Sequence, residues 1–135
     1  MNRSTYLKQH QEIREQMDTI QRLVNENLPE KNAETIAHCV ARLAGIISVH
    51  LSMEDKFMYP KLAESTDDKI KSLGTRYQKQ MGSIAANFTV YKDKYNTKAE
   101  VLQGASKIKA ETDKMFKEIL NRIKTEEAEL YQYIS

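Results

Sequence analysis

The sequence predicts an all-α protein, an antiparallel up-down-up-down four-helix bundle that forms one domain over residues 1–135. Apolar residues recur every three or four positions almost from end to end, and no segment alternates like a strand. A chain of 135 residues also suits one domain with its own core. The pattern is nearly heptad, so a dimeric coiled coil is the structural alternative. The short link at residues 28–31 favours a chain that folds back on itself.

Caps and prolines delimit the first two predicted helices. The first is expected to begin at a Ser4 or Thr5 cap and to end at residues 28–29. The second is expected to be capped near Asn32, and Pro60 is expected to kink or stop it.

Two polar segments indicate the starts of the remaining helices. Ser65–Asp68 offers a hydroxyl cap and acidic residues for the first turn of a third helix, which carries apolar residues from 70 to 95. Thr97–Glu100 has the form of a capping box for the last helix, while Gly104 is expected to kink or restart it. That helix is expected to reach Tyr133.

The composition excludes several classes of partner. Charged residues make up 30% of the chain, are mixed in sign and leave a net charge of only +2, so we expect neither nucleic acid nor membrane as a partner. The single cysteine, Cys39, excludes an internal disulfide and suits a reducing compartment. Residues 1–15 lack the apolar core of a signal peptide, and apolar runs such as 44–49 are much shorter than a membrane span. A cytoplasmic location is therefore expected.

Polar residues on the inner faces of the predicted helices indicate the site. They are His10, His50, Glu54 and Glu126. His50 and Glu54 are four residues apart and project from one side of a helix, and His10 lies about as far from the first turn as His50 does. Glu126 reaches the same level only if the third turn lies near residues 100–104. A buried carboxylate needs a balancing charge, and nitrogen with carboxylate ligands suits iron, manganese or zinc.

Three segments surround the candidate ligands: Lys8–Ile13, His50–Pro60 and Lys124–Tyr131. Together they resemble the hemerythrin-like, or HHE cation-binding, domain family. The run His50–Pro60 is similar to the family's signature, Lys8–Ile13 resembles the segment around its first-helix histidine, and Lys124–Tyr131 resembles its fourth-helix Glu-Glu stretch. The resemblance implies a four-helix bundle that holds two non-haem irons. Members of this family bind oxygen or nitric oxide, store or sense iron, or repair iron sites, and the resemblance implies a function of this kind.

Two positions depart from the family pattern. The third-helix histidine is replaced by Met81, and the histidine four residues before the last glutamate is replaced by Arg122. In the family these two histidines serve one metal, while the histidines that correspond to His10 and His50 serve the other and the carboxylates bridge the two. The resemblance therefore implies one iron or none, and we expect the Arg122 guanidinium to supply part of the missing cation's charge by pairing with Glu54 or Glu126.

Other polar residues have simpler interpretations. Glu127 is expected to be solvated, and Met81 is expected to fill the core. The tyrosines expected to pack with their hydroxyls near the surface are Tyr77, Tyr91, Tyr95, Tyr131 and Tyr133. His38 faces solvent in this pattern; a phosphotransfer histidine is the alternative, although its surroundings resemble such domains only loosely.

The favoured function is a metal-binding sensor or carrier rather than an enzyme, with a metal ion and a small diatomic molecule as possible ligands. The alternative is a metal-free bundle that serves as an interaction or signalling module with a protein partner.

Overall fold

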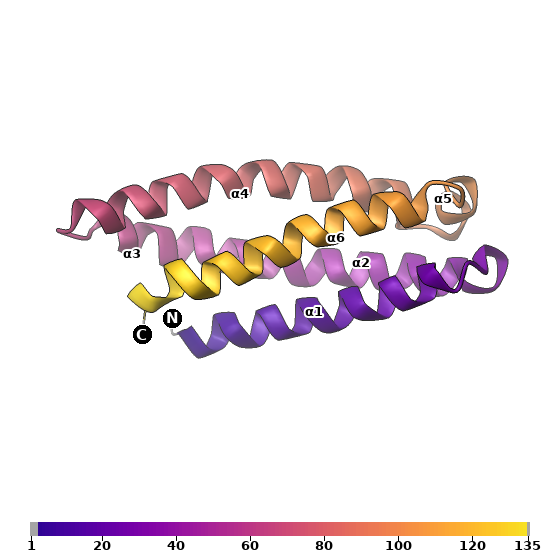
Figure 1. Ribbon diagram of the computed structural model, residues 1–135, viewed down its shortest axis with the longest axis horizontal. Coiled ribbons are helices and arrows are strands. Elements are labelled where there is room, and N and C mark those ends of the chain that lie inside the picture. The colour runs from indigo at the N-terminus through magenta and orange to yellow at the C-terminus, as the bar shows by residue number, and fades with distance from the viewer. Residues whose placement is uncertain (1–2, 135) are drawn as a thin grey trace.

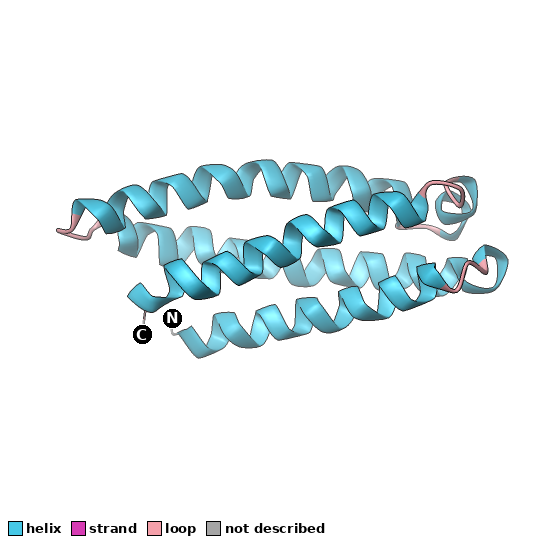
Figure 2. Ribbon diagram, in the orientation of Figure 1, coloured by secondary structure: helices cyan, strands magenta, loops and turns pink. Residues whose placement is uncertain are grey.

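The chain is helical along almost the whole of residues 3–134, the part that its computed structural model describes (Figure 2). Four long helices lie side by side (Figure 1): α1 (Arg3–Asn25), α2 (Pro29–Met53), α4 (Asp68–Tyr95) and α6 (Ile108–Thr125). The shorter elements are η1 (Glu54–Met58), α3 (Tyr59–Ala63), α5 (Lys98–Gln103), η2 (Glu126–Leu130) and η3 (Tyr131–Tyr133). No strand occurs within this range, which confirms the prediction of an all-helical fold.

The first two helices begin earlier than predicted. Ser4 and Thr5 lie inside α1, which already includes Arg3. The second helix starts at Pro29, not near Asn32, because proline is preorganised for the first helical position and lacks the N–H that would be unpaired there. Asn32 is instead buried in the first turn of α2, where its amide donates to a main-chain carbonyl of α1 at 3.3 Å.

Pro60 does not end the second helical segment. It lies in the first turn of α3, which continues to Ala63. A π turn, η1, joins α2 to α3, and there the Tyr59 N–H bonds to the Glu54 carbonyl. A π turn holds one more residue than an α turn and commonly marks a functional site.

The caps of the later helices are partly as predicted. The cap of α4 is the Asp67 carboxylate, which accepts from the Lys69 N–H at 2.9 Å, and not a hydroxyl. Thr97 caps α5 as predicted, since its hydroxyl accepts from the Glu100 N–H at 3.2 Å. That helix ends at Gln103, however, and the long helix α6 starts only at residue 108. The late start lets Glu126 reach the level of the histidines.

The buried residues form two apolar clusters with a polar layer between them. The larger cluster reaches Ile13 in α1, Ile47 in α2 and Ile123 in α6. The smaller cluster resumes with Tyr6 in α1 and with Met58 beyond α2. His10, His50, Glu54 and Glu126 lie between these limits, and the buried Arg122 lies beside them, one residue before Ile123.

Within the described residues, the helical segment 29–63 is long and apolar enough to cross a membrane by length and composition alone. This segment contains the buried polar residues His50 and Glu54, and it packs against α1, α4 and α5. A core helix of a bundle meets the same criterion, so the measure is weak evidence for a membrane span.

The Asp67 cap gives a test of the local structure. Asp67→Ala is expected to lower the free energy of unfolding by about 1 kcal/mol, because the Lys69 N–H loses its acceptor. Asp68→Ala removes an acid of the same first turn but leaves the cap, and it should cost less. Urea unfolding followed by circular dichroism measures both, and equal losses would contradict the assignment of the cap.

Candidate metal centre

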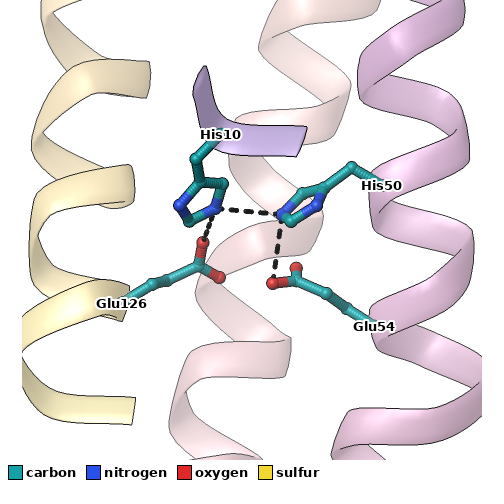
Figure 3. Close-up of side chains that lie close together, drawn as sticks. All are labelled: His10, His50, Glu54 and Glu126. Carbon is teal, nitrogen blue, oxygen red and sulfur yellow. Dashed lines mark hydrogen bonds and ion pairs between the residues drawn. The ribbon is translucent and has the colours of Figure 1, made fainter. Parts of the chain in front are cut away.

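The four side chains predicted as metal ligands meet inside the polar layer (Figure 3). His10 comes from α1 and His50 from α2, while Glu54 and Glu126 are the first residues of the π turns η1 and η2. Each offers one ligand atom, and these four atoms lie within 4.8 Å of one another. All four residues are buried, so the sequence-predicted group is brought together in full.

The two imidazoles turn their Nε2 atoms toward each other at 3.1 Å. His10 Nδ1 lies 2.8 Å from the Glu127 carboxylate, and His50 Nδ1 lies 2.6 Å from the side-chain oxygen of Gln9. Those oxygens only accept, so each Nδ1 carries the proton and each Nε2 of a neutral ring presents its lone pair to the centre. A second proton on one ring, or a cation between the rings, is needed to make this contact favourable.

The carboxylates complete the group from the other side. The Glu54 Oε2 atom lies 3.2 Å from His50 Nε2, and the Glu126 Oε1 atom lies 3.2 Å from His10 Nε2. The second oxygens, Glu54 Oε1 and Glu126 Oε2, are buried and have no hydrogen-bond donor among the described residues. A buried acceptor left without a donor is costly, and a bound cation would remove the cost.

The pKa values of the two carboxyls move apart. Burial raises the pKa of Glu126 well above its usual value, and the charge of Glu54 raises it further. Burial also acts to raise the pKa of Glu54, but contacts with His50 and a hydrogen bond from Tyr131 outweigh it and leave that pKa below its usual value. Burial lowers the pKa of His10. Without a metal, these shifts favour a proton retained within the carboxyl pair and a neutral His10 ring.

Arg122 occupies one side of the layer. Its guanidinium donates to the Tyr77 carbonyl at 2.6 Å and to the Gln80 side chain at 3.2 Å, and it lies 4.2 Å from the centre of the Tyr77 ring. The expected ion pair forms with Glu126, but through one nitrogen only, with Nε 3.5 Å from Oε2. The guanidinium is thus held by neighbours outside the ligand group and still faces a carboxylate.

Met81 faces the same centre from α4. It is half-buried and, together with Arg122, His10 and His50, lines a cavity of about 30 Å³ whose other walls are mainly apolar. A space of this size exceeds what one water molecule needs. The prediction that Met81 fills the core needs correction to this extent, because some space remains beside it.

Three residues that sequence reasoning did not select complete the surroundings. Gln9 and Glu127 orient the imidazoles, and Arg14 in turn donates to both oxygens of Glu127 at 3.0 and 3.1 Å. The expectation that Glu127 is solvated is therefore only partly met, because its side chain is 26% exposed and pairs with His10 and Arg14. The expectation that the Tyr131 hydroxyl lies near the surface is wrong, because Tyr131 is 1% exposed and its hydroxyl donates to Glu54 at 2.8 Å.

One sequence signal could have found Tyr131. Each site glutamate is followed by a tyrosine five residues later, Glu54 by Tyr59 and Glu126 by Tyr131. In an α-helix these pairs would face different directions. In a π turn the main-chain N–H of the fifth residue bonds back to the first, as the N–H groups of both tyrosines do here, and the two residues come close together.

The raised pKa of Glu126 predicts that the free energy of unfolding of chelator-treated protein depends on pH. Because the pKa of Glu126 is higher in the folded than in the unfolded chain, its contribution to stability is present below a pH of about 4.5 and is lost as the pH rises through the folded value. Glu126→Gln is therefore expected to gain stability over the wild type between pH 5 and pH 8, by about 1–3 kcal/mol. Urea unfolding in chelator at both pH values checks this. The exposed Glu12→Gln is the control, and a constant difference between Glu126→Gln and wild type would contradict the assignment.

Comparison with known proteins agrees with the geometry. A family model described as the hemerythrin HHE cation binding domain matches residues 2–134. No curated protein and no solved structure gives a significant match. The match covers nearly the whole chain and includes all four side chains of the buried group. The chain belongs to the hemerythrin HHE cation-binding domain family.

Proposed function

We propose that the chain binds one metal ion, iron, through His10, His50, Glu54 and Glu126, and that it acts as a sensor or carrier and not as an enzyme. The observation that carries the proposal is the pair of imidazole Nε2 atoms 3.1 Å apart, each ring held through its Nδ1 by an acceptor. Neutral rings oriented in this way present lone pairs, which is the form that binds metals. The two carboxylates beside them add negative charge, and one oxygen of each, Glu54 Oε1 and Glu126 Oε2, accepts no hydrogen bond from the described residues.

The donor set and the family favour iron. Imidazole nitrogen and carboxylate oxygen suit iron, manganese and zinc, and the resemblance to hemerythrin-like domains selects iron among them. A bound iron would supply a redox-active centre that can attract a small diatomic molecule. The cavity of about 30 Å³ next to the histidines offers space for such a molecule and is lined mainly by apolar side chains.

Met81 and Arg122, which replace the family's ligands for a second metal, favour one ion and not two. Met81 offers only a thioether sulfur, and Arg122 offers no lone pair, so neither replaces a lost histidine as a ligand. The permanent positive charge of Arg122 lies 3.5 Å from Glu126 and supplies part of what a second cation would provide. We therefore infer a site with one metal ion and one fixed guanidinium around the same two carboxylates.

The proposal extends to the scaffold and its setting. The long helices α1, α2, α4 and α6, joined by turns at alternate ends, support an antiparallel four-helix bundle. The cytoplasmic location, the absence of a nucleic-acid or membrane partner and the possible protein partner stay predictions from the sequence.

Metal analysis of freshly purified protein tests the function. After expression in iron-rich medium and before any chelator, we expect one iron per chain, because only one set of ligands is complete. His50→Ala should lose the iron, whereas His38→Ala should keep it, since His38 is exposed and lies outside the group. Two irons per wild-type chain would contradict the single-ion site. Wild-type protein without metal would instead favour a metal-free interaction or signalling module.

Restoring histidines at positions 81 and 122 tests whether these two residues occupy the position of the family's second metal. The double variant Met81→His and Arg122→His is expected to raise the iron content toward two per chain, because both side chains line one cavity beside Glu126. Met81→Leu with Arg122→Lys is a matched control that supplies no lone-pair donor at neutral pH. An iron content unchanged from wild type in the double-histidine variant would refute the assignment of positions 81 and 122 to a second metal.

A further inference from the structure

The Tyr131 hydroxyl lies among the ligand atoms on the side of the two histidines. Its oxygen is 2.8 Å from Glu54 Oε2, 2.9 Å from His10 Nε2 and 3.4 Å from His50 Nε2. The residue is 1% exposed, so solvent does not account for this orientation. The hydroxyl thus touches three of the four groups assigned to the metal.

These distances match those between atoms that bind one ion. Nitrogen and oxygen donors bound at about 2.0–2.2 Å stand about 2.8–3.6 Å from their neighbours in tetrahedral or octahedral arrangements. The contacts among the histidines and glutamates are 3.1 and 3.2 Å, and those of Tyr131 run from 2.8 to 3.4 Å. By distance, the Tyr131 oxygen is a fifth member of the group.

Hydrogen bonding alone does not satisfy the three contacts. A tyrosine hydroxyl has one hydrogen, and here it is directed at Glu54. The Nε2 lone pairs of His10 and His50 face the same oxygen, and their Nδ1 protons are already given to Glu127 and Gln9. A cation in this space satisfies all the lone pairs at once.

The backbone holds Tyr131 in this position. Its N–H closes the π turn by bonding to the Glu126 carbonyl, so the glutamate and the tyrosine approach the centre together. Its ring stacks on His10, with centroids 5.1 Å apart and planes at 22°, and packs against Tyr6 at 5.5 Å. The hydroxyl therefore reaches the centre from a side chain fixed by packing.

We propose that Tyr131 is a further ligand of the metal, bound as a phenolate, and that the site consequently takes ferric iron. This inference rests on the proposed function. On binding, the phenol O–H bond breaks, an oxygen–iron bond forms, and the phenol proton leaves to water together with the proton held by the carboxyl pair. The iron enters as Fe³⁺, so no oxidant is required. Phenolate is a hard anionic donor that pairs with ferric iron, as the tyrosine ligand of haem iron in catalase also shows. Two carboxylates and one phenolate would supply three negative charges to the Fe³⁺ ion and the neighbouring Arg122 guanidinium.

Visible spectroscopy of the iron-loaded protein tests the ligand. Metal-free protein is loaded with Fe³⁺ as a citrate complex and freed of excess iron, and absorption and resonance Raman spectra are recorded. We expect a visible phenolate-to-iron charge-transfer band with enhanced tyrosine ring modes. Tyr131→Phe should retain the fold and some iron but lose the band, and its affinity for Fe³⁺ should fall by about tenfold or more, while its affinity for Zn²⁺ changes much less.

Tyr59→Phe is the matched control. Tyr59 occupies the same position after Glu54, but its hydroxyl lies 3.4 Å from Arg122, so this variant should keep the band. One iron per chain without the band, or a band that survives in Tyr131→Phe or disappears only in Tyr59→Phe, would overturn ligation by Tyr131 and leave the single-iron site standing. Failure of the wild type to bind iron would overturn the proposed function and this inference together.

Discussion

The middle of the structure is governed by the electrostatic cost of burying four ionisable side chains between two apolar clusters. Two glutamates and two histidines at one level would be strongly unfavourable unless their charges and lone pairs found partners. In the metal-free protein, the raised pKa of Glu126 favours a proton within the carboxyl pair, and the Tyr131 hydroxyl is directed at Glu54. Two carboxylate oxygens remain without donors, and the histidine nitrogens face each other. The cost that remains is the free energy that a cation can recover.

The residues around the ligands fix where that cation can bind. Gln9 and Glu127 determine which nitrogen of each imidazole carries the proton, and Arg14 holds Glu127 in place with two contacts. The π turns η1 and η2 begin at the two glutamates and change the helical register there. The hydrogen bonds to the imidazoles and the π turns are both present without a metal, so the ligand side chains would need little rearrangement to bind one.

The sequence was sufficient for the helical fold and for the four clustered side chains because both depend on α-helical periodicity. His10, His50, Glu54 and Glu126 each stand at an inner position of that pattern, which makes them visible without coordinates. The pattern failed where the backbone departs from it. Tyr131 follows a π turn, so the α-helical register assigned its hydroxyl to the surface.

The other errors have different physical causes. Asn32 looked like a cap, but Pro29 starts the helix earlier and leaves the amide of Asn32 to bond across to α1. Glu127 is half-buried because it pairs with Arg14, which lies on a helix more than a hundred residues away in the chain. Contacts of that range are not visible in local sequence patterns.

In the proposed single-ion site, Arg122 would change the chemistry as well as the number of ions. A guanidinium supplies a positive charge that stays constant, since arginine is not deprotonated in proteins. An iron ion can change its charge by one unit, so a pair of irons can share two electrons and a single iron beside an arginine cannot. Arg122 is also fixed by the Tyr77 carbonyl and Gln80, which prevents it from following a charge that moves within the site. If one iron binds as proposed, the site would exchange a single electron at most, and the charge of Arg122 would stay the same in both oxidation states.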